Sequence, residues 1–305
     1  MFLADAHCDT LYSIAVLGAS PESCAVTEER LARGGVGIQT FAMFAGPKGA
    51  AGAYSKNVRS MLDSLGKTGI PMLRGDLPAA PPDTPHGVLS IEGGEALEGS
   101  LEVLREFDAR ARLRMIALTW NNENEIAHPA RDGAHGGLKP FGRALLAEMD
   151  RRGILADVSH LNEAGFWDVC EQSSLPPIAS HSNCRWLCPV PRNLRKDQVR
   201  AIIEREGFIG VNFYPPFLTR KQTARVEEVF RHIDAICEMG GERIVGFGSD
   251  FDGIDRCPVG LETPADFPML IDFMRARGYR EAQIENIAGM NFWRILKYAE
   301  EIRAN

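Results

Sequence analysis

Short apolar runs alternate with amphipathic stretches along the whole 305-residue chain, and few folds accommodate such a pattern. Most of the apolar runs are hydrophobic almost without interruption, as expected for parallel strands that are buried on both faces. The stretches between them have helical periodicity, and several end at glycine. Eight strand–helix units predict an α/β protein with a closed (β/α)8 TIM barrel rather than an open sheet. The predicted strands are FLADAHCD, VGIQTFAMF, GVLSIEG, RMIALTW, ILADVSH, PPIASHS, FIGVNFY and RIVGFGSD.

Residues 1–305 are predicted to form a single domain, because no Pro/Ser-rich linker separates two halves. After the eighth strand, MNFWRILKYAEEIR has the pattern of a final helix that covers the outside of the barrel. The helical patterns between the strands include TEERLARGG, SLEVLREFDAR, FGRALLAEMDRRG, LRKDQVRAIIEREG and RVEEVFRHIDAICEMGG.

Composition excludes several classes of protein. The formal net charge of −7, without a clustered basic excess, predicts no nucleic-acid partner. No apolar stretch approaches the length of a membrane span and no signal pattern precedes the first strand, so we expect no membrane partner and a cytoplasmic location. The seven cysteines lack pairing spacings, which predicts reduced thiols. Cys184 and Cys188, the one close pair, are interpreted as structural rather than as zinc ligands.

Reactive side chains fall at the carboxyl ends of the predicted strands. In an extended strand His7 and Asp9 project from the same face and Cys8 from the other. A hydrogen-bonded histidine beside a solvated aspartate would explain this pair alone. Six such residues on different strands are better explained by a site at the carboxyl-terminal mouth of the barrel, where enzymes of this fold carry their chemistry. The six are His7, Asp9, Glu92, His160, His181 and Asp250.

The mixed nitrogen and oxygen donors suit zinc or a similar first-row divalent ion, and they are too rich in nitrogen for calcium or magnesium. Two ions fit this set better than one. A carboxylate such as Glu92 can bridge two cations about 3.5–4 Å apart, which leaves His7 and Asp9 for one ion and His160 and His181 for the other. The stretch GFGSDFDG follows a strand and lacks the ligand spacing of an EF-hand calcium loop or the glycines of a dinucleotide fingerprint.

Taken in order, the motifs resemble the membrane dipeptidase (renal dipeptidase) family of metal-dependent amidohydrolases, and the match covers most of the chain. DAHCDT resembles its opening His-x-Asp motif, and SIEGG resembles its bridging-glutamate motif. DVSHLNE and ASHSN look like its two histidine strands, PRNLRKDQ its arginine segment and VGFGSDFDG its last barrel strand.

The resemblance implies a binuclear zinc site bridged by Glu92, and hydrolysis of dipeptides by a metal-bridging hydroxide, including dipeptides with a C-terminal D-residue. It also implies a homodimer. Asp250 would be the catalytic residue that moves the proton, and Arg192 would hold the free carboxylate of the substrate, a task suited to a bidentate guanidinium. Tyr214 matches a position near the substrate pocket, although an aromatic residue packed at a strand end would explain it as well.

One position departs from the family pattern. Members typically have a histidine after Leu-Thr on the fourth strand, thought to polarise the scissile carbonyl, whereas this chain reads ALTWNNEN with Trp120 there. An indole N–H donates one hydrogen bond but cannot become cationic. We hypothesise that Asn121, His128 or His135 provides a replacement donor or shapes the pocket; a surface loop is the simpler explanation for the segment containing the two histidines.

Two other functions remain open at this point. The same barrel and metals would serve a hydrolase of N-acyl amino acids or other small amides, because those substrates also present a carboxylate to Arg192. A catalytically silent metal- or ligand-binding protein is the second alternative, and Trp120 is the feature that favours it.

Overall fold

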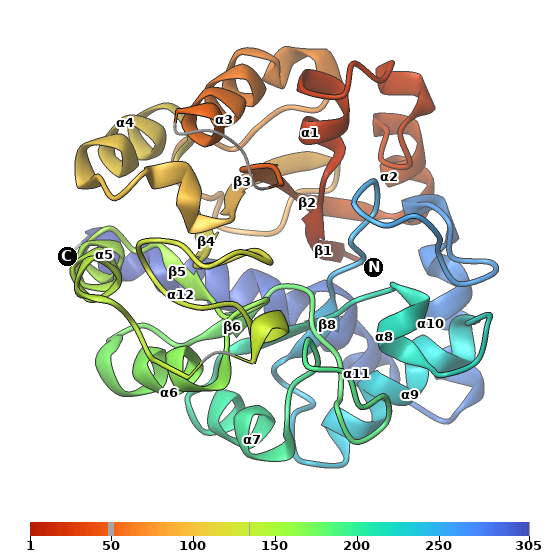
Figure 1. Cartoon of the computed structure of the whole chain (residues 1–305). Helices are drawn as coiled ribbons and strands as arrows, with labels where there is room; N and C mark the ends of the chain where they lie inside the picture. The colour runs from red at the N-terminus through yellow and green to blue at the C-terminus, as the bar shows by residue number, and fades with distance from the viewer. Residues whose placement is uncertain (48–51, 134, 305) are drawn as a thin grey trace.

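The computed structural model describes residues 1–47, 52–133 and 135–304, and within them eight parallel strands close into a barrel in sequential order from β1 to β8. The predicted fold class is confirmed. Helices surround the strands on the outside (Figure 1). The strands are β1 (Leu3–Cys8), β2 (Val36–Phe44), β3 (His86–Glu92), β4 (Met115–Ala117), β5 (Leu155–Asp157), β6 (Ile178–Ala179), β7 (Phe208–Val211) and β8 (Val245–Phe247).

The amphipathic stretches form the predicted helices, and local caps set several of their ends. The Thr27 side chain accepts a hydrogen bond from the Arg30 amide at the start of α2, and Gly35 ends this helix with a φ of 74°, a conformation that favours glycine. The longer helices are α2 (Glu28–Gly34), α3 (Ala53–Asp63), α4 (Leu101–Ala111), α5 (Pro140–Arg151), α6 (Glu163–Gln172), α7 (Lys196–Glu204), α9 (Val226–Cys237), α10 (Phe267–Ala276) and α12 (Asn291–Ala304), and the shorter ones are α1 (Thr10–Ala15), α8 (Pro215–Leu218) and α11 (Glu281–Glu285).

Several strands end earlier than their apolar runs. β5 ends three residues before His160, and β8 ends three residues before Asp250. Both residues have left-handed backbones, with φ values of 67° and 68°. This conformation is uncommon for non-glycine residues and turns the chain out of the strand direction. The functional side chains of these two units therefore project from tight turns above the barrel rather than from the strands themselves.

The expected C-terminal helix is present, but it lies across the amino-terminal end of the barrel and not on its side. In Figure 1 it runs behind the strands. Phe292 packs at a ring-centroid distance of 4.9 Å on Phe208, the first residue of β7. Leu296 belongs to the same buried cluster as Met115 and Leu155, which begin β4 and β5. The apolar face of α12 therefore closes the bottom of the barrel, opposite the mouth.

All seven cysteines are free thiols, as predicted. Cys184 and Cys188 are both buried. The Cys184 amide donates to Nδ1 of the buried His232 at 3.0 Å, which gives this segment a packing role. Within the described residues, no helix combines the length and the apolar character needed to span a lipid bilayer.

Candidate metal centre

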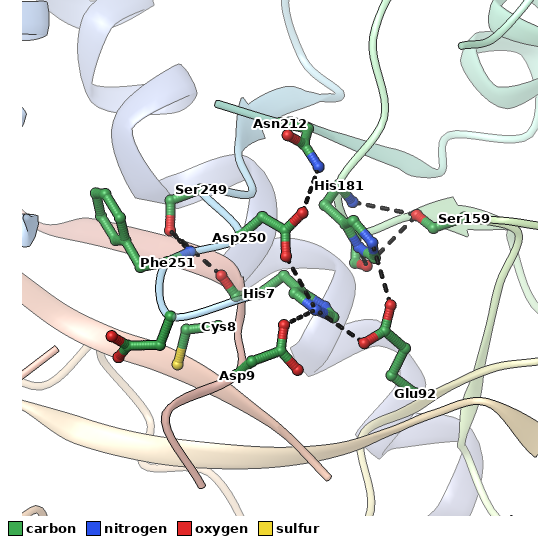
Figure 2. Close-up of polar contacts among 12 residues, drawn as sticks. His7, Cys8, Asp9, Glu92, Ser159, His181, Asn212, Ser249, Asp250 and Phe251 are labelled. Carbon is green, nitrogen blue, oxygen red and sulfur yellow. Dashed lines mark hydrogen bonds and ion pairs between the residues drawn. The ribbon is translucent and has the colours of Figure 1, made fainter. Parts of the chain in front are cut away.

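The predicted histidines and carboxylates come together at the mouth of the barrel. Figure 2 shows the His7 imidazole between three carboxylates, with the Cys8 sulfur pointing away. His7 Nε2 lies 3.5 Å from Asp9 Oδ2, 3.6 Å from Glu92 Oε2 and 3.8 Å from Asp250 Oδ1. Asp9 directly follows β1 and precedes α1. His7 and Asp9 therefore converge although Asp9 lies just outside the strand.

Glu92 lies between two groups of donors. Its Oε2 faces His7, while its Oε1 lies 3.0 Å from His160 Nε2 and 3.5 Å from His181 Nε2. Donor atoms of His7, Glu92 and His181 all lie within 4.8 Å of one another, and so do those of His7, Asp9 and Asp250. The carboxylate of Glu92 is thus oriented with one oxygen toward each half of the cluster.

The cluster fits divalent cations on three observations. His7 Nε2 and Asp9 Oδ1 are buried without a hydrogen-bond partner. Burial raises the pKa of Asp9 to about 8, and the neighbouring charge of Glu92 adds to this effect. The Nε2 atoms of His160 and His181 lie only 3.0 Å apart. Cations placed among these atoms would coordinate the two unpartnered ligand atoms and relieve the repulsion between the carboxylates.

Hydrogen bonds fix the protonation of two imidazoles. The Ser180 hydroxyl donates to the buried Asp157 carboxylate, so it can only accept from His181 Nδ1, which lies 2.7 Å away. Asn121 Oδ1 lies 3.2 Å from His160 Nδ1 and accepts a hydrogen bond from its N–H. Both rings therefore direct the unprotonated Nε2 toward Glu92, as metal ligands require. Burial also favours the neutral ring, lowering the pKa of His160 to about 4.

A second buried aspartate supports the opposite side of the cluster. Asp5, inside β1, accepts hydrogen bonds from the Ser249 amide at 2.8 Å and from the Ser249 hydroxyl at 2.5 Å. Asn212 Nδ2 donates to Asp250 Oδ2 at 2.8 Å. Ser249 and Asn212 thereby hold the turn and the carboxylate of Asp250, leaving its Oδ1 toward His7.

Sequence reasoning missed these supporting residues, including Ser180 and Asn212. A signal for part of them was present, because Asp5 and Asp157 are charged residues inside otherwise apolar strands. A buried carboxylate needs hydrogen-bond donors nearby. Each of the two aspartates finds these donors in a serine that directly precedes a residue of the cluster.

Above the cluster lies a cavity of about 610 Å³, a volume typical of small-molecule sites. Arg192 lies in its wall and donates to Ser182 Oγ at 2.8 Å and to the His181 carbonyl at 2.9 Å. Burial lowers the pKa of Arg192 to about 10, so the guanidinium is still cationic at neutral pH. The residues predicted to bind substrate, Arg192, Tyr214, Trp120 and Asn121, all line this cavity.

The two histidines of the loop after β4 lie elsewhere. His135 is exposed, and His128 Nδ1 is 3.5 Å from Glu123 Oε2. Neither is among the residues that line the cavity. Of the three proposed replacement donors, Asn121 alone faces it.

Comparison with known proteins agrees with this geometry. Residues 83–305 match the family model described as membrane dipeptidase (Peptidase family M19). The chain belongs to the membrane dipeptidase family. It is 36% identical over 220 residues to a Klebsiella pneumoniae protein named only by its position in the pqqA 5′ region, with 69% of this chain and 80% of that protein covered. It spans 52–60% of the length of the fungal dipeptidases that it matches.

Two solved metallopeptidase structures share the whole fold. The dipeptidase AC, a metallopeptidase of family M19, superposes with a TM-score of 0.89 at 28% identity, over 98% of both chains. A metallopeptidase from Rhodobacter sphaeroides, bound to a phosphinate mimic of the dipeptide L-Ala-D-Ala, superposes with a TM-score of 0.85 at 26% identity. That alignment covers 97% of this chain and 99% of the other. The family predicted from the sequence motifs is thus confirmed.

Proposed function

We propose that this protein is a dipeptidase that uses two zinc ions bridged by Glu92. The observation that carries the proposal is the orientation of Glu92, whose two carboxylate oxygens face separate groups of nitrogen and oxygen donors on the floor of a cavity. Zinc is the ion we favour, because imidazole and carboxylate donors in this mixture suit it. Membership of the membrane dipeptidase family supports the same activity.

In this proposal His7 and Asp9 would hold one ion, His160 and His181 would hold the other, and Glu92 would be shared by both. When bound, such ions polarise the scissile carbonyl and lower the pKa of a water molecule toward neutrality. The chain itself orients the donors, since Ser180 and Asn121 fix the histidine tautomers. Metal ligands oriented in this way lose less conformational freedom on binding.

Asp250 is proposed to move the proton. Its Oδ2 is held by Asn212, and its Oδ1 faces the cluster and the cavity. Burial raises the pKa of Asp250 to about 6, and the charge of Glu92 adds to this. A carboxylate with a raised pKa accepts a proton from the attacking water and then delivers it to the departing amine.

Arg192 is proposed to bind the C-terminal carboxylate of the substrate, and Tyr214 also lines the cavity wall. A guanidinium that is already held by Ser182 and the His181 carbonyl loses little entropy on binding. Dipeptides with a C-terminal D-residue are included among the proposed substrates, because the Rhodobacter sphaeroides relative was solved with an L-Ala-D-Ala mimic.

The proposal is tested by loading the purified protein with zinc, measuring the metal content, and assaying L-L and L-D dipeptides beside their N-acetylated forms. We expect about two zinc ions per chain and cleavage of the free dipeptides. Asp250→Asn should bind zinc but lose cleavage, while Asp272→Asn, at an exposed position, should keep both. Cleavage of the N-acetylated forms alone would favour an amide hydrolase, and tight dipeptide binding without any cleavage would favour a silent binder.

A further inference from the structure

Three aromatic side chains form a continuous row in the cavity. Tyr12 and Phe44 have a ring-centroid distance of 4.9 Å, and Phe44 and Trp120 have one of 4.8 Å. All three line the cavity and are only partly buried by the protein. We refer to Tyr12, Phe44 and Trp120 as the aromatic wall. Apolar rings left partly open inside a cavity gain free energy when an apolar group covers them.

The aromatic wall begins beside the metal cluster. Phe44 ends β2 and pairs in register with Glu92 at the end of β3, so both side chains emerge at the same height and on the same face. The Trp120 ring lies 6.4 Å from the His160 ring. A peptide bond positioned over Glu92 is therefore close enough to this wall for the side chain of an adjoining residue to contact it.

Arg192 lies on the other side of the mouth. It is in the loop after β6, and the sequential order of the closed barrel puts β6 across from β2. A dipeptide whose carboxylate is held by Arg192 extends over the ligand cluster toward β2. Its second residue then lies on the side of Arg192, and its first, amine-bearing residue lies at the aromatic wall.

The loop after β8 brings two further acidic residues to the cavity, Asp252 and Asp255, and Asp255 interacts with the Tyr214 side chain. Asp252, the acidic residue of the cavity nearest in sequence to Asp250, already accepts hydrogen bonds from Thr10 Oγ1 at 2.6 Å and from the Ala25 amide at 2.7 Å. Its carboxylate therefore joins two loops of the protein and is engaged before any substrate binds.

We infer that the aromatic wall is the subsite for the side chain of the first residue, and that the enzyme prefers dipeptides beginning with a large apolar or aromatic residue. This inference rests on the proposed function. Trp120, where the family pattern has histidine, enlarges the apolar surface of this subsite. Burying a large apolar side chain against it is expected to raise kcat/KM about 10- to 100-fold over glycine at the same position.

The test compares zinc-loaded wild-type protein on Phe-Ala and Gly-Ala, and separately on Ala-Phe and Ala-Gly. The measured quantity is the ratio of kcat/KM within each pair. We expect the first ratio to be about 10–100 in the wild type and to fall about 5- to 10-fold in Phe44→Ala, with partial recovery in Phe44→Leu. The second ratio should change little. Trp167→Ala, which replaces an exposed tryptophan on α6, is the matched control and should change neither ratio.

Ratios separate a subsite from a structural role, because a disturbed metal cluster would slow both members of a pair equally. A wild-type first ratio near 1 would overturn the inference while leaving the dipeptidase activity established. A loss in Phe44→Ala confined to the Ala-Phe pair would overturn it too, since the wall would then contact the second residue. If the wild type cleaves none of the four dipeptides, the proposed function itself fails and this inference fails with it.

Discussion

Replacing Ser180 by alanine is expected to weaken zinc binding about 10- to 100-fold while leaving the barrel folded. The Ser180 hydroxyl is the group that accepts a hydrogen bond from the Nδ1–H of His181. Without it, the imidazole loses the hydrogen bond that keeps its Nε2 unprotonated and directed toward Glu92. The ring is then free to adopt the other tautomer, in which Nε2 carries the proton and cannot bind a metal.

The size of the effect follows from what the substitution removes. Asp157 loses one donor at Oδ2, but its Oδ1 still accepts from the Ser180 amide at 3.0 Å and the Ser159 amide at 2.9 Å. The carboxylate thus keeps most of its partners, and the cost to folding is about 1 kcal/mol. Loss of a partner that orients a ligand typically costs 10- to 100-fold in metal affinity, which corresponds to about 1.4–2.7 kcal/mol.

The assay is an equilibrium competition for zinc against a chromophoric chelator, with thermal unfolding of the metal-free proteins as a check on folding. Asp157→Asn should weaken zinc binding at least as much, because the asparagine amide donates to Ser180 and so makes its hydroxyl donate to His181. Ser159→Ala is the matched control, since this serine contacts the His181 amide at 3.2 Å and not its ring. The reasoning would be refuted if Ser180→Ala and Ser159→Ala both bound zinc with the wild-type affinity.

Three further outcomes are expected. Arg192→Lys should raise KM for dipeptides about 10- to 100-fold with a smaller effect on kcat, as steady-state kinetics will show, because an ammonium cannot form the bidentate pair. Removing zinc with a chelator should lower Tm, and free zinc at 100 times Kd should restore about 2.7 kcal/mol of unfolding free energy for each bound ion. Arg151, with Arg152 and Arg105, lowers the pKa of Glu148 to about 2. This stabilisation is present above the ordinary pKa of 4.5 and is lost as the pH falls toward 2. The free energy of unfolding of Glu148→Gln, measured with denaturant, should therefore change less with pH over that range than that of the wild type. The difference should be about 1–2 kcal/mol, which allows for the solvent exposure of Arg151.

The barrel and its cluster were predictable because both depend on strand periodicity. Strands that are buried on both faces have a pattern visible in the sequence, and their carboxyl ends must meet at one mouth once eight of them close. Glu92 ends β3, and its neighbours in the cluster come from β1, β5, β6 and β8, as the order of the motifs predicts. Convergence of these residues therefore follows from topology and needs no detail of the turns.

The position of the last helix was harder to infer. The pattern of MNFWRILKYAEEIR identifies an amphipathic helix but does not say which apolar surface it covers. The bottom of the barrel is lined by residues that begin the strands, such as Met115 and Leu155, and this surface also needs a cover. Phe292 and Leu296 supply it. Periodicity gives the face of a helix, whereas its partner depends on long-range packing.

The turns above the strands were the least predictable part, and they determine how the cluster is built. His160 and Asp250 adopt left-handed backbones, which are uncommon even though His and Asp adopt them more often than most non-glycine residues, so residue type alone does not indicate the turn. Such conformations persist when surrounding contacts impose them. Here contacts come from Asn121 and Asn212, which follow the neighbouring strands β4 and β7 and hold the two side chains.

Asp5 and Asp157 show how such turns can nevertheless be anticipated. A carboxylate within or at the end of a doubly buried strand is costly unless donors surround it, and the apolar side chains of the strand supply none. Gln39 of β2 donates to Asp5 and the Ser159 amide donates to Asp157, and further donors come from just beyond the adjacent strand of the barrel, which is β8 for Asp5 and β6 for Asp157. In both cases they are the amide and hydroxyl of a serine, followed directly by Asp250 or His181. A charged residue inside an apolar barrel strand therefore predicts a fixed turn on the neighbouring strand, and with it the place where a functional side chain is held.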